Sequence, residues 1–476
     1  MRGHTCLPES YLLTEAAKLL RVPAEKIADE LDPMVGRSLI VRERGLVQLK
    51  SHYLDERLIS EKMQILVRRG VVSQSQPPQM DDLAEDQVEA LDKATKSGVF
   101  ILTGAPGTGK TFLIGRIIDS LPKAKLELAA PTGKASRRMT EQSGRSAQTM
   151  HKLLEPEKVK GAFQFKRGKN RPIEADIIVL DEVSMVDTWL MARFLDAVAP
   201  GTRLILVGDT HQLPSIGPGN VLNDLIECGL IPCSELTVIK RQNPGLIVQN
   251  CHHIKNGEDV EIDNADGSDF LFIECDDEKE AHKAIVELVC GKLQRREGCD
   301  ILRDVQVIAP LRKRTLLSCE ALNAAFQERL RPGPEDAGTV LRVGDKVIQT
   351  KNNYELGVIN GDIGFVADVD KKNRKIWVRF DHPDRLVEFP LWDNDLQLAY
   401  AVTVHKFQGS EASIIVMPMH KCLGTFIMQR NLLYTAVSRA KDICILVGQS
   451  AEIPKVIKRN QQQRRHTRLR EMLQRF

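Results

Sequence analysis

The sequence predicts an α/β fold in which parallel strands alternate with helices, and three stretches predict it. The first, Val99–Leu102, leads through a glycine-rich turn into the apolar stretch Phe112–Ile118. The others, Ala175–Leu180 and Arg203–Val207, are largely apolar, and acidic residues follow each of them. Such runs are typical of strands buried on both faces, as in parallel sheets covered by helices.

The composition is that of an ordinary globular chain. It has 476 residues, of which 42% are hydrophobic and 28% charged, enough for roughly three domains. A net charge of +3 is too small to indicate a nucleic-acid partner, so any basic surface must be local. The chain has no apolar leader and no run of about 20 apolar residues, so we expect a cytoplasmic protein without a membrane partner. Its scattered cysteines predict reduced thiols.

Residues 1–78 predict a winged-helix-like domain followed by a linker. Two helical patterns, Tyr11–Leu20 and Pro23–Leu31, precede Ser38–Leu49, whose two halves alternate around Gly45 as in a hairpin. Helices followed by a hairpin are typical of a winged helix. Such a domain binds DNA in some proteins and serves only for packing in others, and no basic recognition helix decides between the two.

The turn between the first strand and its helix is a phosphate-binding loop. It reads Gly104, Ala105, Pro106, Gly107, Thr108, Gly109, Lys110, Thr111. Its glycines let backbone N–H groups converge on phosphate oxygens at a helix N-terminus. Lys110 is expected to reach the β- and γ-phosphates, and Thr111 to hold Mg²⁺. The chain is therefore predicted to bind a nucleoside triphosphate.

Polar residues near this loop and after the next buried strands predict the remaining nucleotide chemistry. Asp181 and Glu182 follow the strand at 175–180; paired acids are also common helix caps, but here we expect Asp181 to hold Mg²⁺ and Glu182 to deprotonate the attacking water. Gln212 is expected to sense the γ-phosphate, the alternative being an ordinary polar turn. Gln87, on the helix before the loop, has an amide that can pair with adenine or simply be solvated.

Four further segments carry weaker patterns. Pro131–Arg138 follows a predicted strand and suits either a phosphodiester contact or a solvated helix start. Residues 155–172 are basic and predict a protruding hairpin. Residues 340–395 alternate in short strands and predict a small β-barrel. Residues 451–476 predict a basic C-terminal helix.

The order of these motifs resembles that of superfamily-one helicases. The residues within them resemble those of the RecD-like family, relatives of the alpha subunit of exodeoxyribonuclease V. The matching stretches are the phosphate loop, Asp181–Met185, Gly208–Gly217, Arg241, Val402–Glu411 and Tyr434–Lys441. Phe407 stands where the family has a small polar residue. The resemblance covers about residues 80 to 450 and is to a short form of the family.

The resemblance implies two RecA-like domains, 79–232 and 233–450, that clamp ATP between them while single-stranded DNA crosses both. An SH3-like insertion is implied at about 340–395. Arg241 and Arg439 are implied as arginine fingers. The implied nucleotide contacts include Gln87, Gly409 and Glu411, and the implied DNA contacts are Pro131, Thr132, His151, His405 and Lys406.

The implied activity is that of an ATP- and Mg²⁺-dependent 5′→3′ DNA helicase of repair or recombination. Its expected substrates are single-stranded and tailed duplex DNA, and it is expected to act as a monomeric motor. An RNA helicase of the same superfamily shares every ATPase motif and stays an alternative. A protein-remodelling ATPase is a second alternative, which the matches at 402–411 and 434–441 disfavour.

Overall fold

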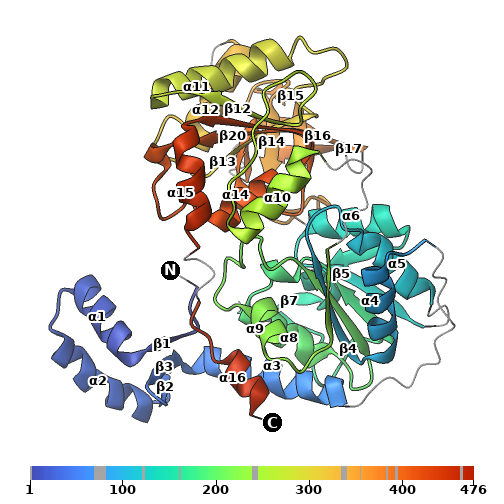
Figure 1. Ribbon diagram of the computed structural model, residues 1–476, viewed down its shortest axis with the longest axis vertical. Coiled ribbons are helices and arrows are strands. Elements are labelled where there is room, and N and C mark those ends of the chain that lie inside the picture. The colour runs from blue at the N-terminus through green and yellow to red at the C-terminus, as the bar shows by residue number, and fades with distance from the viewer. Residues whose placement is uncertain are drawn as a thin grey trace. The chain divides into compact units, whose positions relative to one another are not determined.

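The computed structural model describes residues 3–68, 82–120, 124–159, 162–237, 245–333, 340–353, 355–381, 384–391, 395–460 and 465–475. The chain forms two compact units (Figure 1). The first comprises Met1–Pro131, Ala135–Lys240 and Gln461–Phe476, and the second Thr132–Lys134 and Arg241–Asn460. The C-terminal tail therefore belongs with the first unit. Within the described ranges, no helix combines the length and apolar character needed to cross a membrane.

A six-stranded parallel sheet forms the centre of the first unit, with the strand order β11-β4-β10-β9-β5-β6. Alternate residues of one strand enter different cores: Ile101 packs in the core on one face, and Phe100 and Leu102 in the core on the other. The α/β prediction is thereby confirmed. The strands are β4 (Val99–Gly104), β5 (Leu126–Ala130), β6 (Ala147–Thr149), β9 (Ile177–Leu180), β10 (Arg203–Gly208) and β11 (Cys233–Leu236).

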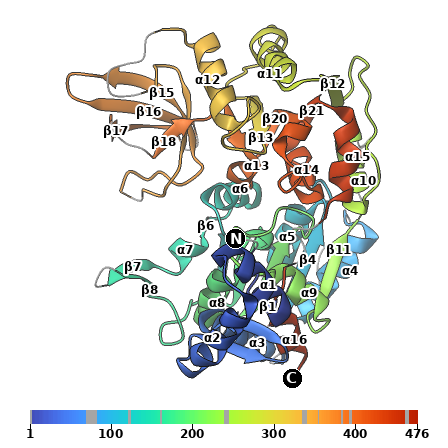
Figure 2. The same cartoon turned by 90° about the vertical axis from the view of Figure 1, so that its left-hand side faces the viewer.

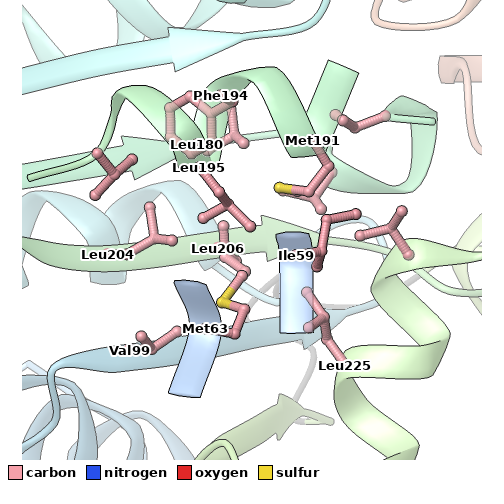
Figure 3. Packing of buried hydrophobic residues seen from close by; sticks show 14 of the residues in the cluster. Ile59, Met63, Val99, Leu180, Met191, Phe194, Leu195, Leu204, Leu206 and Leu225 are labelled. Atoms are coloured by element: carbon pink, nitrogen blue, oxygen red, sulfur yellow. The ribbon is translucent and has the colours of Figure 1, made fainter. Parts of the chain in front are cut away.

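Helices cover both faces of this sheet. On one face, Ile59 and Met63 of α3 (Lys50–Arg68) lie among side chains of β10 and α8 (Thr188–Ala197), as Figure 3 shows. On the other face pack α4 (Glu85–Lys96) and α5 (Lys110–Asp119), through residues such as Leu91 and Leu113. The strands are thus buried on both sides, as their continuous apolar sequences predict.

The second unit has its own parallel sheet, with the strand order β12-β21-β20-β13-β19. Helices α11 and α12 lie on one face of it and α10, α14 and α15 on the other (Figure 1). The strands are β12 (Phe270–Glu274), β13 (Val305–Ala309), β19 (Ala401–Thr403), β20 (Ala412–Met419) and β21 (Ala440–Gly448). The helices are α10 (Leu246–Asn256), α11 (Glu278–Glu287), α12 (Cys319–Leu330), α14 (Arg430–Val437) and α15 (Ile453–Lys458).

A small antiparallel barrel-like sheet is inserted in the second unit, with the order β17-β16-β15-β14-β18 (Figure 2). Its own core contains Val347, Val378 and Phe389. The β-barrel prediction for this region is therefore confirmed. The strands are β14 (Lys346–Gln349), β15 (Ile363–Asp370), β16 (Lys375–Asp381), β17 (Asp384–Pro390) and β18 (Leu396–Leu398).

The N-terminal segment has a winged-helix-like arrangement. Helices α1 (Glu9–Leu20) and α2 (Ala24–Gly36) precede the hairpin of β2 (Ile40–Glu43) and β3 (Leu46–Leu49), and β1 (Cys6–Pro8) pairs with β3. The two turn residues, Arg44 and Gly45, have φ of 54° and 72°. Two successive left-handed residues are what a tight hairpin turn requires, so Gly45 lies where the sequence places the turn.

A second hairpin forms where the sequence predicts a protrusion. Strand β7 (Pro156–Val159) pairs antiparallel with β8 (Ala162–Phe165), and Figure 2 shows the pair projecting beyond α7 (Met150–Leu153) and α8. Residues 155–172 therefore include the hairpin that the sequence predicts there.

The C-terminal tail is not the single helix that the sequence predicts over 451–476. It contains α15, which belongs to the second unit, and α16 (Leu469–Gln474), which belongs to the first. Residues 460–467 contain no apolar side chain that could hold a continuous helix against a core. Leu469 and Leu473 instead enter the same core as Ile59 and Met63.

A buried polar cluster fastens α16 to the N-terminal segment. The Arg468 side chain is fully buried and donates to Glu43 at 2.6 Å. Buried Glu56 accepts from the Thr5 hydroxyl at 2.6 Å and from the Gln48 amide at 2.7 Å. Nearby, the Thr467 hydroxyl donates to Asp224 at 3.0 Å. Buried polar groups are costly unless paired, so these contacts fix where the tail can lie.

Asp224 makes the stability of this cluster depend on pH. Burial raises the pKa of its carboxyl to about 7, although the Thr467 hydroxyl opposes the change. Between about pH 4 and pH 7, the folded chain thus holds a proton that the unfolded chain releases, so this group makes the free energy of unfolding fall as pH rises.

We expect Asp224→Asn to stabilise the first unit, and more at pH 8 than at pH 5, with a difference on the order of 2 kcal/mol. Thermal or denaturant unfolding at the two pH values measures it. Glu89→Gln is the matched control, because Glu89 lies in the same unit and forms an exposed pair with Lys93. An equal gain in the free energy of unfolding at both pH values would contradict a raised pKa for Asp224.

Candidate active site

Three strand ends of the first sheet meet at one edge. Strand β10 lies between β4 and β9, and all three run parallel. Gly208 pairs with Thr103, just before the phosphate loop, and Leu206 pairs with Leu180, just before Asp181. Neighbouring strands lie about 4.8 Å apart, so the acid pair begins about 10 Å from the loop backbone. The register therefore brings the predicted nucleotide residues to one edge.

The phosphate loop has a backbone that needs its glycines. Gly104, Gly107 and Gly109 have φ of 154°, 81° and 81°. A Cβ on Gly104 would lie 2.8 Å from the carbonyl oxygen of Leu236 and from Oγ1 of Thr108. Helix α5 begins at Lys110, so its first N–H groups face the loop. Converging N–H groups at a helix N-terminus are the features that bind phosphate.

Lys110 is held inside this loop. Its Nζ donates to the carbonyl oxygens of Gly104 at 2.6 Å and Ala105 at 3.0 Å. Burial lowers its pKa, and the carboxylates of Asp209, Asp181 and Glu182 oppose that shift. The amine is therefore influenced by acidic residues that follow β9 and β10. Phosphate oxygens of a bound nucleotide can replace the two carbonyl oxygens as hydrogen-bond acceptors.

Asp181 and Glu182 have different conformations and environments. Burial and, next to it, the charge of Glu182 raise the pKa of Asp181 to about 6, although the Glu182 N–H, which donates to Asp181 at 2.8 Å, opposes this shift. Glu182 has φ of 53°, in the left-handed region that non-glycine residues seldom adopt. Such conformations cost about 1–3 kcal/mol and persist mostly at functional sites.

The residues predicted to hold Mg²⁺ carry the kind of ligand atom that this ion prefers. Thr111 lies in the first turn of α5, and Asp181 follows the strand two positions across the sheet. Mg²⁺ prefers oxygen ligands and is usually held by one or two carboxylates or hydroxyls together with substrate phosphates and water. One hydroxyl and one carboxylate beside a phosphate loop are a donor set of that composition.

Two glutamines are buried at the same edge. Gln87 donates from its amide to the Thr108 carbonyl at 3.2 Å and accepts from the Ala84 N–H at 3.2 Å, so it is not simply solvated. Gln212 lies in the loop after β10 and donates to Asp209 at 3.4 Å. Within the described residues its buried Oε1 has no hydrogen-bond partner. Both side chains therefore form hydrogen bonds with residues of the loops around the site.

The remaining nucleotide residues of the prediction lie in the second unit. Arg439 is buried at the end of α14, where it donates to the Thr435 carbonyl at 3.3 Å and to the Ser438 hydroxyl at 3.1 Å. Gly409 has φ of 73° and Glu411 precedes β20. Arg241 lies outside the described residues. The arginine-finger roles stay predictions.

An aromatic row joins the hairpin to its neighbours in the first unit. The His151 ring on α7 lies 5.8 Å from Phe165 of β8, and Phe165 lies 5.7 Å from Trp189 of α8. Burial lowers the pKa of His151, so its imidazole is neutral near pH 7. Trp189 is 42% exposed. Sequence reasoning missed Trp189, although an exposed tryptophan at the start of a helix is itself a signal.

The other predicted DNA contacts occupy two loops after strands. Pro131 and Thr132 lie between β5 and α6 (Gly133–Ser143). In the second unit, α13 (Val404–Phe407) carries exposed His405 and carries Lys406, which donates to Gln397 at 3.0 Å. Phe407 on the same helix is buried.

Three domain families match the chain in order. An AAA domain matches residues 82–272, an ATP-dependent RecD-like DNA helicase SH3 domain matches 322–380, and a UvrD-like helicase C-terminal domain matches 398–447. The SH3 match overlaps the antiparallel barrel, and the other two cover most of the two parallel sheets.

Curated relatives decide the family. The RecD subunit of the RecBCD enzyme of Mycobacterium tuberculosis is 31% identical over 418 residues, covering 79% of this chain and 71% of that protein. The chain belongs to the RecD-like helicases. The ATP-dependent RecD2 DNA helicase of Deinococcus radiodurans is 35% identical over 400 residues, covering 82% of this chain and 52% of that protein. The chain thus spans about half the length of that RecD2 relative.

A solved structure shows the same fold for this RecD-like chain. The Bacteroides Pif1 helicase bound to single-stranded DNA has a TM-score of 0.50 and 20% identity, covering 80% of this chain and 95% of that one. The predicted RecD-like family and two-domain α/β class are confirmed by these comparisons together with the two observed sheets.

Gln87 provides a test of nucleotide selectivity. If its amide reads adenine, Gln87→Ala should raise the KM for ATP about three- to tenfold more than the KM for GTP, the worth of one hydrogen bond. Steady-state hydrolysis of both nucleotides measures this. Glu89→Ala, an exposed change on the same helix, is the control. An equal rise in KM for both nucleotides would indicate that Gln87 supports the phosphate loop and does not read adenine.

Proposed function

We propose that this chain is an ATP-dependent DNA helicase that moves 5′→3′ on single-stranded DNA and unwinds duplex in DNA repair or recombination. The observation that carries the proposal is the meeting of the phosphate loop, Asp181–Glu182 and Gln212 at one edge of a parallel sheet in a RecD-like chain. In this proposal the two units are its two motor domains, and the boundary predicted at 232/233 moves beyond β11, because that strand pairs with β4 of the first sheet.

The site residues divide the chemistry of ATP hydrolysis among them. The phosphate loop and Lys110 bind the phosphates through N–H groups and the amine. Glu182 orients the attacking water and accepts its proton. Asp181 and Thr111 hold Mg²⁺, which neutralises phosphate charge when bound. Since the pKa of Asp181 is about 6, its carboxyl is mostly ionised at pH 7.5 and available to the metal.

DNA contact is assigned to residues of both units. In the first unit the row of His151, Phe165 and Trp189 offers aromatic faces, and stacking of a base on such a face contributes about 1–3 kcal/mol. Pro131 and Thr132 follow β5 and are proposed to contact the DNA backbone. His405 and Lys406 are proposed contacts from the second unit. None of these residues reads base sequence, so we expect binding without sequence preference.

Steady-state ATP hydrolysis with and without single-stranded DNA tests the proposal. DNA should stimulate hydrolysis, and rising salt should weaken the stimulation. Glu182→Gln should lower kcat about 100-fold or more while nucleotide binding persists, because the general base is lost. Glu174→Gln, an exposed carboxylate before the same strand, is the control.

Two outcomes would redirect the proposal. Equal stimulation by RNA oligonucleotides would favour an RNA helicase, and hydrolysis indifferent to any nucleic acid would favour a protein-remodelling ATPase. Duplexes with a single overhang then test direction. Unwinding is expected from a 5′ overhang, and unwinding confined to a 3′ overhang would reject the proposed polarity.

A further inference from the structure

The loop that carries Gln212 is held by an arginine from the far end of the chain. Arg465 donates from Nη1 to the Ser215 hydroxyl at 3.1 Å and to the carbonyl oxygens of Gly217 at 2.9 Å and Gly219 at 2.8 Å. Its Nη2 donates to the Ser215 carbonyl at 2.7 Å. One guanidinium therefore joins three residues of the loop. Its donors lie in one plane and point in several directions, an arrangement that a lysine ammonium does not have.

The N-terminal segment completes this clasp. The Gly219 N–H donates to the Gly3 carbonyl at 2.9 Å, and the Thr5 N–H donates to the His466 carbonyl at 3.0 Å. Gly3 has φ of 75°, and a Cβ there would lie 2.4 Å from Cζ of Arg465. Only glycine fits this close approach without displacing the guanidinium.

The opposite side of the loop packs on the start of α8. The Thr188 N–H donates to the Pro218 carbonyl at 3.0 Å. A Cβ on Gly217 would lie 2.0 Å from Oδ2 of Asp187, the residue that caps α8. The loop is thus enclosed between Arg465 and the helix that follows the acid pair. Burial lowers the pKa of Arg465 and the Asp187 carboxylate opposes that shift, so the clasp keeps a charge partner.

Arg465 itself lies outside the helicase motifs, although Ser215 and Gly217, which it contacts, belong to one of them. The domain match to the helicase C-terminal region ends at residue 447, and Arg465 comes after it. Asn460 is the last residue of the second unit, so only residues 461–464 lie between that unit and Arg465 in the sequence. Among the described residues, Arg465 is the first after the second unit, and it contacts the Gln212 loop.

We propose that Arg465 is a positioning residue that fixes the loop 212–219 and thereby sets how strongly DNA stimulates ATP hydrolysis. The proposal rests on the proposed function, since it assigns the coupling of that same site. Gln212 stands at the beginning of the loop, next to Asp209 and the strand ends. A loop held at Ser215, Gly217 and Gly219 keeps Gln212 in one place. Without the clasp, we expect basal hydrolysis to persist and its response to DNA to weaken.

The test compares Arg465→Met with Arg470→Met in the full chain. Arg470 is the matched control, because it is an arginine of the same tail and forms an exposed pair with Glu227. The readout is the ratio of kcat with single-stranded DNA to kcat without it. A loss of folded protein lowers both rates equally and leaves the ratio unchanged, so the ratio reports positioning rather than stability.

We expect Arg465→Met to lower this ratio about fivefold or more, with the KM for ATP changed less than about twofold, and Arg470→Met to leave the ratio unchanged. The ratio for Arg465→Lys should lie between those of Arg465→Met and the unsubstituted chain, because lysine keeps the charge but lacks the planar set of donors. Gly3→Ala reaches the clasp from the other chain end and should lower the ratio in the same direction. This variant keeps the test valid if Arg465→Met does not fold.

A double-mutant cycle then shows whether Arg465 acts through the loop. In a Gln212→Ala background, Arg465→Met should have no further effect on the ratio. An undiminished ratio in Arg465→Met and Gly3→Ala, with the unsubstituted chain stimulated by DNA, overturns this inference alone. An absence of stimulation in the unsubstituted chain overturns the proposed function, and this inference with it.

Discussion

The parallel pairing of β4, β10 and β9 is the constraint on which the rest of the first unit depends. In the observed register, Gly208 lies opposite Thr103 and Leu206 lies opposite Leu180. That register aligns three loops that come from distant parts of the sequence. The carboxylates of Asp181 and Asp209 act on the pKa of Lys110 because the strands before these three residues end at the same level.

Much of this arrangement could be predicted from residues. Glycines at 104, 107 and 109 have few other uses in a strand–turn–helix context, and the acids at 181–182 follow a run too apolar for a surface strand. The Arg44–Gly45 turn also follows from local chemistry, since two left-handed residues are needed there. In each case the signal lies within about ten residues, and local sequence carries it.

The parts that escaped prediction depend on contacts between distant residues. Nothing local distinguishes Arg465 from the other arginines of a basic tail, because its partners are backbone carbonyls with no sequence signature. Trp189 gains its place in the aromatic row only when β8 folds against α8. The tail divides into two helices because Leu469 and Leu473 fill a core built mainly by the first half of the chain.

That shared core has a consequence for how the protein is made. Most of the first unit is synthesised first, yet its core includes Leu469 and Leu473, which are synthesised after the second unit. The second unit, 241–460, has all of its strands before the tail appears. Although domains usually fold as they emerge, the N-terminal one here reaches its final packing last. The nascent chain therefore keeps part of the apolar surface of α3 uncovered until Leu469 and Leu473 have been synthesised.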